Sequence, residues 1–461
     1  MGATITADYL VMGAGATGMA FVDTILTETD GTVVIVDRRD RPGGHWNDAY
    51  PFVRLHQPAN FYGVNSLALG SGLIDEVGLN AGFYELAAGP EVVSHYDLTM
   101  RHRFLPSGRV TYLPMSEVGE DRVITSLLSG ERTVVDARRF VDATYSRMRI
   151  PSTSPPLYSV AEGLRCAPPN ELAHVAPTFD DFVVIGAGKT GMDTCLWLLE
   201  NGVEPDRIRW IVPRDSWVLN RRNFQPGEEF FAGLCKSLAD QTEATALADS
   251  VDDLFARLEA VDEVRRLDPN VTPEAYHCAI LSDPEMVALR RIGNVIRLGH
   301  VAAIEVATIV LEHGSVPTGP TTLHIDCSAS GFPSVPSVPV FDGDRITLQC
   351  VRLCQLAFSS AFIGFVESHF TDDATKNRIC TPVVPPTVPL DWLRMFRVEL
   401  ANRACWTEFP ELGDWMATSR LDLFTPIART RVGVDVEATE HLGRYLTYIV
   451  QAQENVERLL A

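Results

Sequence analysis

The sequence predicts an α/β fold with two Rossmann-like domains and a helical insertion in the second. Residues 9–19 and 182–193 share one pattern, in which an apolar strand run is followed by G-x-G-x-x-G and then by apolar residues at helical spacing. Each predicted helix leads to a further apolar run, at 32–36 and at 208–212. A β-α-β unit therefore occurs twice in the chain.

Composition narrows the class of protein. A chain of 461 residues is long enough for two or three domains, and 46% apolar residues is typical of a globular protein. No run approaches the roughly 20 apolar residues of a spanning helix, and we see no export signal. The net charge of −21 would repel nucleic acid and anionic lipid. We expect a cytoplasmic protein that binds neither.

The nine cysteines contain no C-x-x-C pair. Cys350 and Cys354 are the closest two, at helical spacing. An odd number of dispersed cysteines is typical of reduced core thiols, so we expect neither a disulfide framework nor a metal site.

The other segments suggest how the domains are divided. A Pro- and Ser-rich connector at 150–157 precedes the second glycine motif, and residues 227–292 have a charged, helical pattern. Apolar runs at 295–298, 303–310 and 322–325 read as returning strands. The predicted parts are a first domain over 1–165, a second over 176–325 with a helical insertion at about 227–292, and a return to the first domain with a helical segment over 326–461.

Both glycine motifs have the context that dinucleotide binding requires. The first two glycines of such a loop allow a tight turn and close approach of the backbone to a pyrophosphate, and the third lets helix and strand pack. The helix N-terminus adds free N–H groups and positive dipole. Two loops predict two dinucleotides, held by Gly13, Gly15 and Gly18 in the first loop and by Gly186, Gly188, Lys189, Thr190 and Gly191 in the second.

The residues after each unit distinguish the two loops. Asp37, followed by Arg38, ends the second strand of the first unit, where a carboxylate suits a ribose hydroxyl. The second unit has Arg214 there instead, and a guanidinium suits the 2′-phosphate of NADP. Arg221 and Arg222 follow, and we expect at least one of them in a solvated loop.

At this point the sequence resembles the class B flavoprotein monooxygenases, a group of flavin-containing, Baeyer–Villiger and N-hydroxylating enzymes. The resemblance rests on Asp37, on Gly43-Gly44-His45-Trp46, and on Tyr50-Pro51 with Arg54. It implies a glutathione-reductase-like fold that binds FAD in the first domain. It also implies that Trp46 lies beside the flavin and that Arg54 reaches toward the reacting centre. Further FAD contacts implied by the resemblance are His45, Gln57, Val118, Ala143, Thr144, Ser330 and Gly331.

The sequence departs from this group in three places. The fingerprint F-x-G-x-x-x-H is missing between Ile150 and Asp181, and His174 lacks the preceding Phe and Gly. Leu55-His56 follows Arg54 where Baeyer–Villiger enzymes carry x-D, so a group that is neutral or protonated near pH 7 replaces an anion. Tyr145 stands where the first A-T-G motif has glycine. These departures indicate a divergent member.

The leading hypothesis is a flavoprotein oxidoreductase that uses FAD and NADPH as a monooxygenase. It would insert one oxygen atom of O2 into a small organic substrate through a flavin hydroperoxide, with Arg54 and His56 as the catalytic candidates. An FAD/NAD(P)H reductase or dehydrogenase without oxygen transfer remains an alternative, as does a catalytically silent flavoprotein that senses redox state or binds a partner. The lack of a redox cysteine pair argues against a disulfide reductase. The sequence does not identify the substrate, and a homodimer remains possible.

Overall fold

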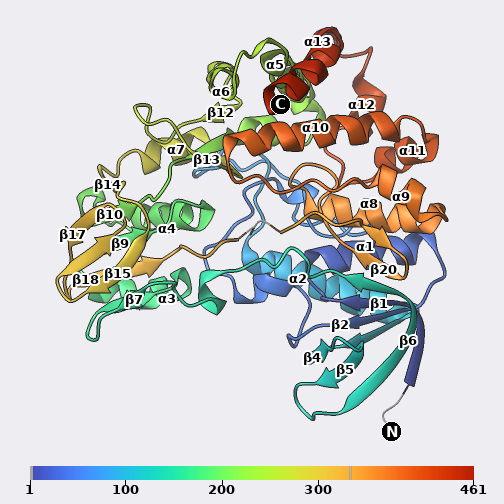
Figure 1. Cartoon of the computed structure of the whole chain (residues 1–461), viewed down its shortest axis with the longest axis horizontal. Helices are drawn as coiled ribbons and strands as arrows, with labels where there is room; N and C mark the ends of the chain where they lie inside the picture. The colour runs from blue at the N-terminus through green and yellow to red at the C-terminus, as the bar shows by residue number, and fades with distance from the viewer. Residues whose placement is uncertain (1–3, 332, 334) are drawn as a thin grey trace.

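Both predicted β-α-β units form in the computed structural model, which describes residues 4–331, 333 and 335–461 (Figure 1). In each unit the two strands pair in parallel. The first unit comprises β1 (Thr4–Met12), α1 (Ala16–Glu28) and β2 (Val33–Val36), and the second comprises β9 (Asp181–Ile185), α4 (Lys189–Glu200) and β10 (Ile208–Ile211).

The first unit is the centre of an eight-stranded sheet, at lower right in Figure 1. Its main path runs β19-β20-β6-β1-β2-β3, and β5 joins β6 with β4 beyond it. Helices α1 and α8 (Leu356–His369) pack together, and their apolar side chains belong to the largest core cluster, which the strands of the sheet also join. The other elements of this part are α2 (Gly89–Thr99), β3 (Val110–Leu113), β4 (Ser116–Val118), β5 (Val123–Ser126), β6 (Arg132–Asp142), β19 (Phe341–Asp342) and β20 (Arg345–Thr347).

The second unit is the centre of a five-stranded parallel sheet of order β14-β10-β9-β18-β8. A smaller sheet of order β17-β16-β15-β7 lies beside it, at the left of Figure 1. The apolar run predicted as one strand at 303–310 is a hairpin, because the chain turns at residues 306–307. The elements are β7 (Ser159–Val160), β8 (Arg165–Ala167), α3 (Pro169–Val175), β14 (Asn294–Ile296), β15 (Val301–Glu305), β16 (Thr308–Leu311), β17 (Gly314–Pro317) and β18 (Thr322–Asp326).

The segment over 227–292 contains strands as well as the expected helices. Its strands β12 and β13 pair with β11 (Ser216–Asn220), and most of β13 is buried. An apolar run buried on both faces lacks strand alternation, which explains why the sequence pattern did not reveal it. The elements are α5 (Phe231–Leu247), α6 (Val251–Ala260), β12 (Val264–Arg265), β13 (Ala275–Leu281) and α7 (Asp283–Leu289).

The chain then returns to the first sheet through β19 and β20 and ends in a helical layer above it (Figure 1). The last helix packs against α5 of the insertion. On its apolar side Val456 is buried, whereas Leu446 and Val450 are 68% and 61% exposed. The layer comprises α8, α9 (Asp373–Ile379), α10 (Pro389–Trp406), α11 (Pro410–Thr418), α12 (Thr425–Arg431) and α13 (Val436–Leu460). Within the described ranges, no helix is long and apolar enough to cross a membrane.

The third glycine of each loop should be essential for stability, while the second glycine of the second loop should not. A Cβ on Gly191 would lie 2.1 Å from the Gly186 carbonyl oxygen, and backbone cannot move aside cheaply. Gly191→Ala should therefore lower the free energy of unfolding by about 3 kcal/mol, measured by urea denaturation.

Gly188→Ala is the matched control. Gly188 has φ −75°, and a Cβ there would meet no atom within 4 Å. This variant should stay within about 1 kcal/mol of the wild type. Equal losses in the two variants would contradict the close approach at Gly191.

Candidate functional site

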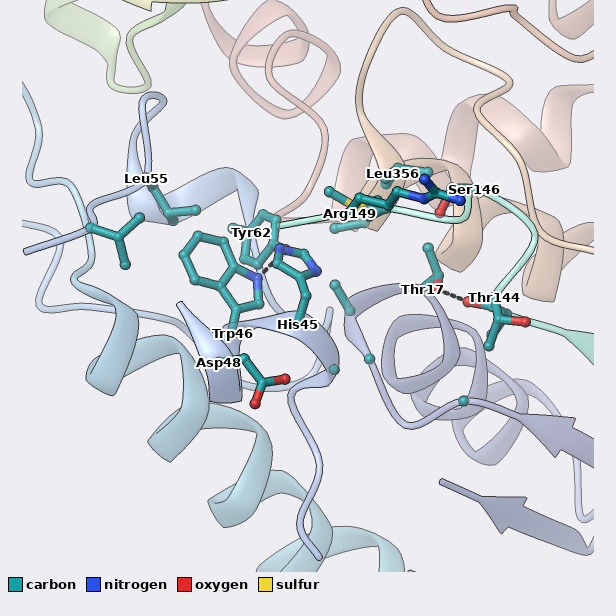
Figure 2. A pocket seen from close by; sticks show the side chains of 18 of the residues that line it. Thr17, His45, Trp46, Asp48, Leu55, Tyr62, Thr144, Ser146, Arg149 and Leu356 are labelled. Atoms are coloured by element: carbon teal, nitrogen blue, oxygen red, sulfur yellow. Dashed lines mark hydrogen bonds between the residues drawn. The ribbon is translucent and has the colours of Figure 1, made fainter. Parts of the chain in front are cut away.

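A cavity of about 770 Å³ lies where the two β-α-β units face each other. Its size falls in the range of about 300–1,000 Å³ that is usual for cofactor and ligand sites. The first glycine loop, the G-G-x-W segment, the connector after β6, the start of α8 and the start of α4 all contribute to its wall. Figure 2 shows the side chains on the first-domain side.

The first glycine loop and the G-G-x-W segment form a wall of bare backbone. Gly13, with φ 106°, donates its N–H to the Val36 carbonyl oxygen at 2.8 Å. A Cβ on Gly18 would lie 2.0 Å from the Gly13 oxygen, and one on Gly44 would lie 2.9 Å from the Gly15 Cα. Gly43 has φ 119°, which favours glycine. A backbone surface without side chains allows a pyrophosphate to approach the N–H groups of these glycines.

Asp37 fixes this loop and also borders the cavity. Its Oδ2 accepts the Ala14 N–H at 2.6 Å, and its Oδ1 accepts the Arg39 N–H at 2.8 Å. Arg38 lines the same end, where Arg39 pairs with Asp48 at 2.8 Å. Asp37, the predicted ribose-binding residue, therefore already accepts two backbone N–H groups, and the remaining lone pairs of its carboxylate are available to a bound molecule.

Trp46 stands in the cavity wall with His45 and Tyr62 around it (Figure 2). The Trp46 Nε1–H donates to the Tyr62 hydroxyl at 2.7 Å, and the His45 and Trp46 ring centroids are 5.2 Å apart. Burial raises the pKa of Tyr62 to about 12 and lowers the pKa of His45 to about 4. Both groups are therefore neutral at physiological pH.

Arg420 holds the segment that carries Tyr62. Its guanidinium donates to the carbonyl oxygens of Asn60, Tyr62 and Val64 at 2.6, 2.5 and 2.8 Å. Three charge-assisted hydrogen bonds from one planar group leave this segment little freedom.

His56 is neutral in the folded protein. Its Nδ1 accepts the Ile280 N–H from β13 at 3.3 Å, which leaves the ring proton on Nε2. Burial, followed by the charges of Lys189 and Arg221, lowers the pKa of His56 to about 3. A pKa this low keeps the folded His56 neutral near pH 7, where the sequence left both protonation states open. Gln57 and Arg54 line the cavity beside it, and Arg54 is exposed and donates to the Leu86 carbonyl oxygen at 3.3 Å.

The second glycine loop meets the same cavity through Lys189 and Asp193. Lys189 Nζ pairs with one Asp193 oxygen, and the Tyr50 hydroxyl donates to the other at 2.7 Å. Its backbone repeats the geometry of the first loop. Gly186, with φ 122°, donates its N–H to the Ile211 carbonyl oxygen at 3.0 Å, and the space above Gly188 is open.

Some predicted residues do not line the cavity. Gly18, Gly43, Gly186, Gly188, Thr190 and Gly191 are not among the residues of its wall. Val118 pairs with Ile124 and packs in an apolar cluster, while Ser330 and Gly331 are exposed. Ala143 and Thr144 do line the cavity.

The arginines of the second domain differ from one another. Arg214 is exposed and has no ion pair within the described ranges. Arg221 is wholly buried, where it pairs with Glu285 at 2.7 Å and donates to Asn80 Oδ1 at 3.1 Å. Arg221 is therefore a structural group and not a phosphate ligand, whereas Arg222 is solvent-exposed, as expected for at least one of the two.

Several lining residues were not foreseen. The connector after β6 contributes Arg147 and Arg149, and the start of α8 contributes Leu356; Figure 2 labels Arg149 and Leu356 among the lining side chains. Because the sequence shows both arginines in the connector between the two glycine loops, they could have been predicted as lining residues. The turn before α8 carries no motif, yet it supplies Cys354 and Gln355, and the buried Gln355 Oε1 lacks a hydrogen-bond partner among the described residues. Within the same residues, no cluster of three or more His, Cys, Asp or Glu is arranged to bind a metal.

Comparison with known proteins identifies relatives and a fold. No protein-family model matches the chain. It is 51% identical over 424 residues to Uncharacterized protein Rv2000 of Mycobacterium tuberculosis and to Uncharacterized protein Mb2023 of Mycobacterium bovis. The match covers 92% of this chain and 79% of each relative.

Solved structures with a similar fold are flavin monooxygenases. An oxidized steroid monooxygenase bound to NADP aligns with a TM-score of 0.52 at 14% identity, over 99% of this chain and 98% of that one. The polycyclic ketone monooxygenase of Thermothelomyces thermophila also has a TM-score of 0.52, at 12% identity, over 99% of this chain and 89% of that one. The chain therefore has a mixed α/β fold similar to that of these monooxygenases.

The neutral state of His56 predicts a pH dependence of stability. Below its ordinary pKa of 6.5, the unfolded chain binds a proton at His56 that the folded chain does not bind, so stability falls as the pH drops from 6.5 toward 3. Between pH 7.5 and pH 5.8 the wild type should lose roughly 1 kcal/mol more than His56→Gln, measured by urea unfolding. The exposed His102→Gln should behave as the wild type, and identical losses in wild type and His56→Gln would show that His56 titrates normally.

Proposed function

The chain belongs to the family of these mycobacterial proteins, and we propose that it is an FAD-dependent, NADPH-consuming monooxygenase that inserts one oxygen atom of O2 into a small organic substrate. One observation carries the proposal: both dinucleotide loops open on a single cavity. Gly13 and Gly15 of the first loop and Asp37 after β2 border it from one side, and Lys189 of the second loop borders it as well. Transfer of a hydride requires the two cofactors to meet at near-contact distance, and one shared cavity allows this.

The first-domain wall fits FAD. Asp37 suits its ribose, and the backbone of Gly13, Gly15 and Gly44 suits its pyrophosphate. Gln355, whose buried Oε1 has no hydrogen-bond partner in the part of the chain that the structure describes, immediately precedes α8, and the N-terminus of this helix adds positive potential to that part of the wall. When bound, FAD would carry the two electrons that activate O2, chemistry that protein side chains do not supply.

The reacting end would lie near Trp46, Tyr62 and His56, where the wall combines aromatic faces with neutral polar groups. The neutral His56 carries its single ring proton on Nε2. It can donate a hydrogen bond through this N–H and keep the proton. The exposed Arg54 adds positive charge at the same part of the wall. This combination suits binding an oxygen atom on which negative charge develops.

A reaction of this kind must take place away from bulk water. The segment from Tyr50 to His56 contacts α4 and the insertion and so limits the entry of water. The Tyr50 hydroxyl donates to Asp193, Phe52 stacks on Trp197 with centroids 5.3 Å apart, and His56 accepts from β13. These contacts join the first-domain wall directly to α4 and to the insertion. They hold the two halves of the cavity together and limit solvent entry there.

The second loop fits a nicotinamide dinucleotide with a 2′-phosphate. The open space above Gly188 leaves room for a pyrophosphate at the N-terminus of α4, and Lys189 adds a positive charge. Arg214 projects after β10 without an ion pair among the described residues, at the position suited to a 2′-phosphate. The NADP bound to the steroid monooxygenase of similar fold supports this choice.

The proposal is tested with purified protein, its flavin spectrum and isotopically labelled oxygen. We expect the bound flavin to bleach on anaerobic addition of NADPH, and one atom of 18O2 to enter the product when small ketones, amines and sulfides are offered in turn. Bleaching by NADPH with no label in any product would favour a reductase. A flavin that NADPH does not bleach would contradict both enzymes and favour a silent flavoprotein.

Arg214 should determine the preference for NADPH over NADH. Loss of a charge-assisted hydrogen bond to a phosphate costs about 1.5–3 kcal/mol, so Arg214→Ala should raise the KM for NADPH roughly 10- to 100-fold and leave the KM for NADH unchanged. Steady-state oxidation of both nucleotides measures this. Arg222→Ala, which removes another exposed arginine, is the control and should change neither value. A parallel loss for both nucleotides in Arg214→Ala would place the 2′-phosphate elsewhere.

A further inference from the structure

The start of α4 presents an acid as well as a base to the cavity. Lys189 and Asp193 lie one turn apart on this helix, and both belong to the cavity wall. Their side chains are only 20% and 11% exposed, and Lys189 Nζ pairs with Asp193 Oδ1. An ammonium and a carboxylate in contact neutralise each other, so the pair adds no net charge to this part of the wall.

Asp193 has a second partner, which comes from the first domain. The Tyr50 hydroxyl donates to Asp193 Oδ2 at 2.7 Å, and one turn further along α4 the Phe52 ring stacks on Trp197. Burial, followed by the charge of Asp193, raises the pKa of Tyr50, so this hydroxyl keeps its proton and remains a donor. One carboxylate oxygen therefore anchors the first domain to α4, while the other holds Lys189.

The anchoring role of Asp193 conflicts with the binding of a dinucleotide at the second loop. A pyrophosphate carries two negative charges, and a carboxylate in the same cavity wall repels it. Lys189 is the only basic residue in the loop 186–191. The ammonium that would attract the pyrophosphate is therefore already neutralised before a ligand arrives.

We propose that Lys189 changes partners when a nicotinamide dinucleotide binds, moving from Asp193 to the pyrophosphate, so that Asp193 lowers the affinity for this cofactor. The inference rests on the proposed dinucleotide site at the second loop. Asp193 keeps its hydrogen bond from Tyr50 during the exchange, because the hydroxyl donates to the other carboxylate oxygen. The contact between the domains is then preserved while the lysine turns to the ligand.

A lowered affinity has a use in an enzyme that consumes NADPH. The oxidised nucleotide must leave after each turnover before a reduced one can enter, and product release limits the rate of many enzymes. When the oxidised nucleotide departs, Lys189 regains its carboxylate partner, which offsets part of the free energy that release costs. Asp193 is thus a residue that tunes cofactor exchange.

Asp193→Asn tests the proposal, because it removes the charge and retains an oxygen that can accept from Tyr50. This variant should bind NADP⁺ roughly 3- to 10-fold more tightly than the wild type, as expected when a partly buried ion pair no longer competes. Isothermal titration of the purified full-length protein measures the dissociation constant without turnover. NAD⁺ has the same pyrophosphate, so its dissociation constant should fall by the same factor.

Lys189→Met separates an exchange of partners from simple repulsion. In this background Asp193→Asn relieves only the repulsion between carboxylate and pyrophosphate, so its gain in affinity should shrink to about 2-fold or less. An equal gain with and without the lysine would overturn the exchange. Asp193→Ser, which also removes the charge, gives the same test through a smaller side chain if Asp193→Asn does not fold.

Two further variants serve as controls. Asp206→Asn removes an exposed acid outside the cavity and should leave both dissociation constants unchanged. Tyr50→Phe removes the contact between the domains but keeps the ion pair, and it should not tighten binding. Unchanged or weaker binding in Asp193→Asn, or equal tightening in Tyr50→Phe, would overturn this inference alone. A wild-type protein that binds neither nucleotide would contradict the proposed dinucleotide site as well.

Discussion

The rest of the structure depends on a close approach of backbone to backbone at two glycines. At Gly18 and Gly191 any side chain would meet the carbonyl oxygen of Gly13 or Gly186 at about 2 Å. The missing side chain lets α1 and α4 start directly against the preceding strands. Each helix therefore directs its N-terminal N–H groups toward the carboxyl edge of its sheet, where ligands of open α/β sheets bind. The cavity lies where these two edges face each other.

The sequence predicted what is local and missed what depends on distant partners. The two β-α-β units with their glycine loops were predictable, and the sequence marked Asp37 and the G-G-x-W segment as candidate site residues, because each is a short pattern with a mechanism. Arg221 was not, because its partners Asn80 and Glu285 are separated from it in the chain. The strand β13 was missed because an apolar run within a charged, helical segment has no strand periodicity.

Some residues of the cavity wall could likewise not be predicted from the sequence. The start of α8 and the turn before it contribute Cys354, Gln355 and Leu356, but no motif marks them. The neutral state of His56 follows from burial and from two positive charges, Lys189 and Arg221, which only the folded chain brings near it. A sequence can identify a histidine at this position, but its protonation depends on those neighbours.

The contacts of Arg420 have a consequence for biosynthesis. This residue holds the carbonyl oxygens of Asn60, Tyr62 and Val64, and the start of α8 also contributes to the cavity wall. During translation the glycine loop and Trp46 leave the ribosome early, whereas Arg420 follows several hundred residues later. The cavity wall, with the segment that Arg420 holds, can therefore be complete only once almost the whole chain has been synthesised.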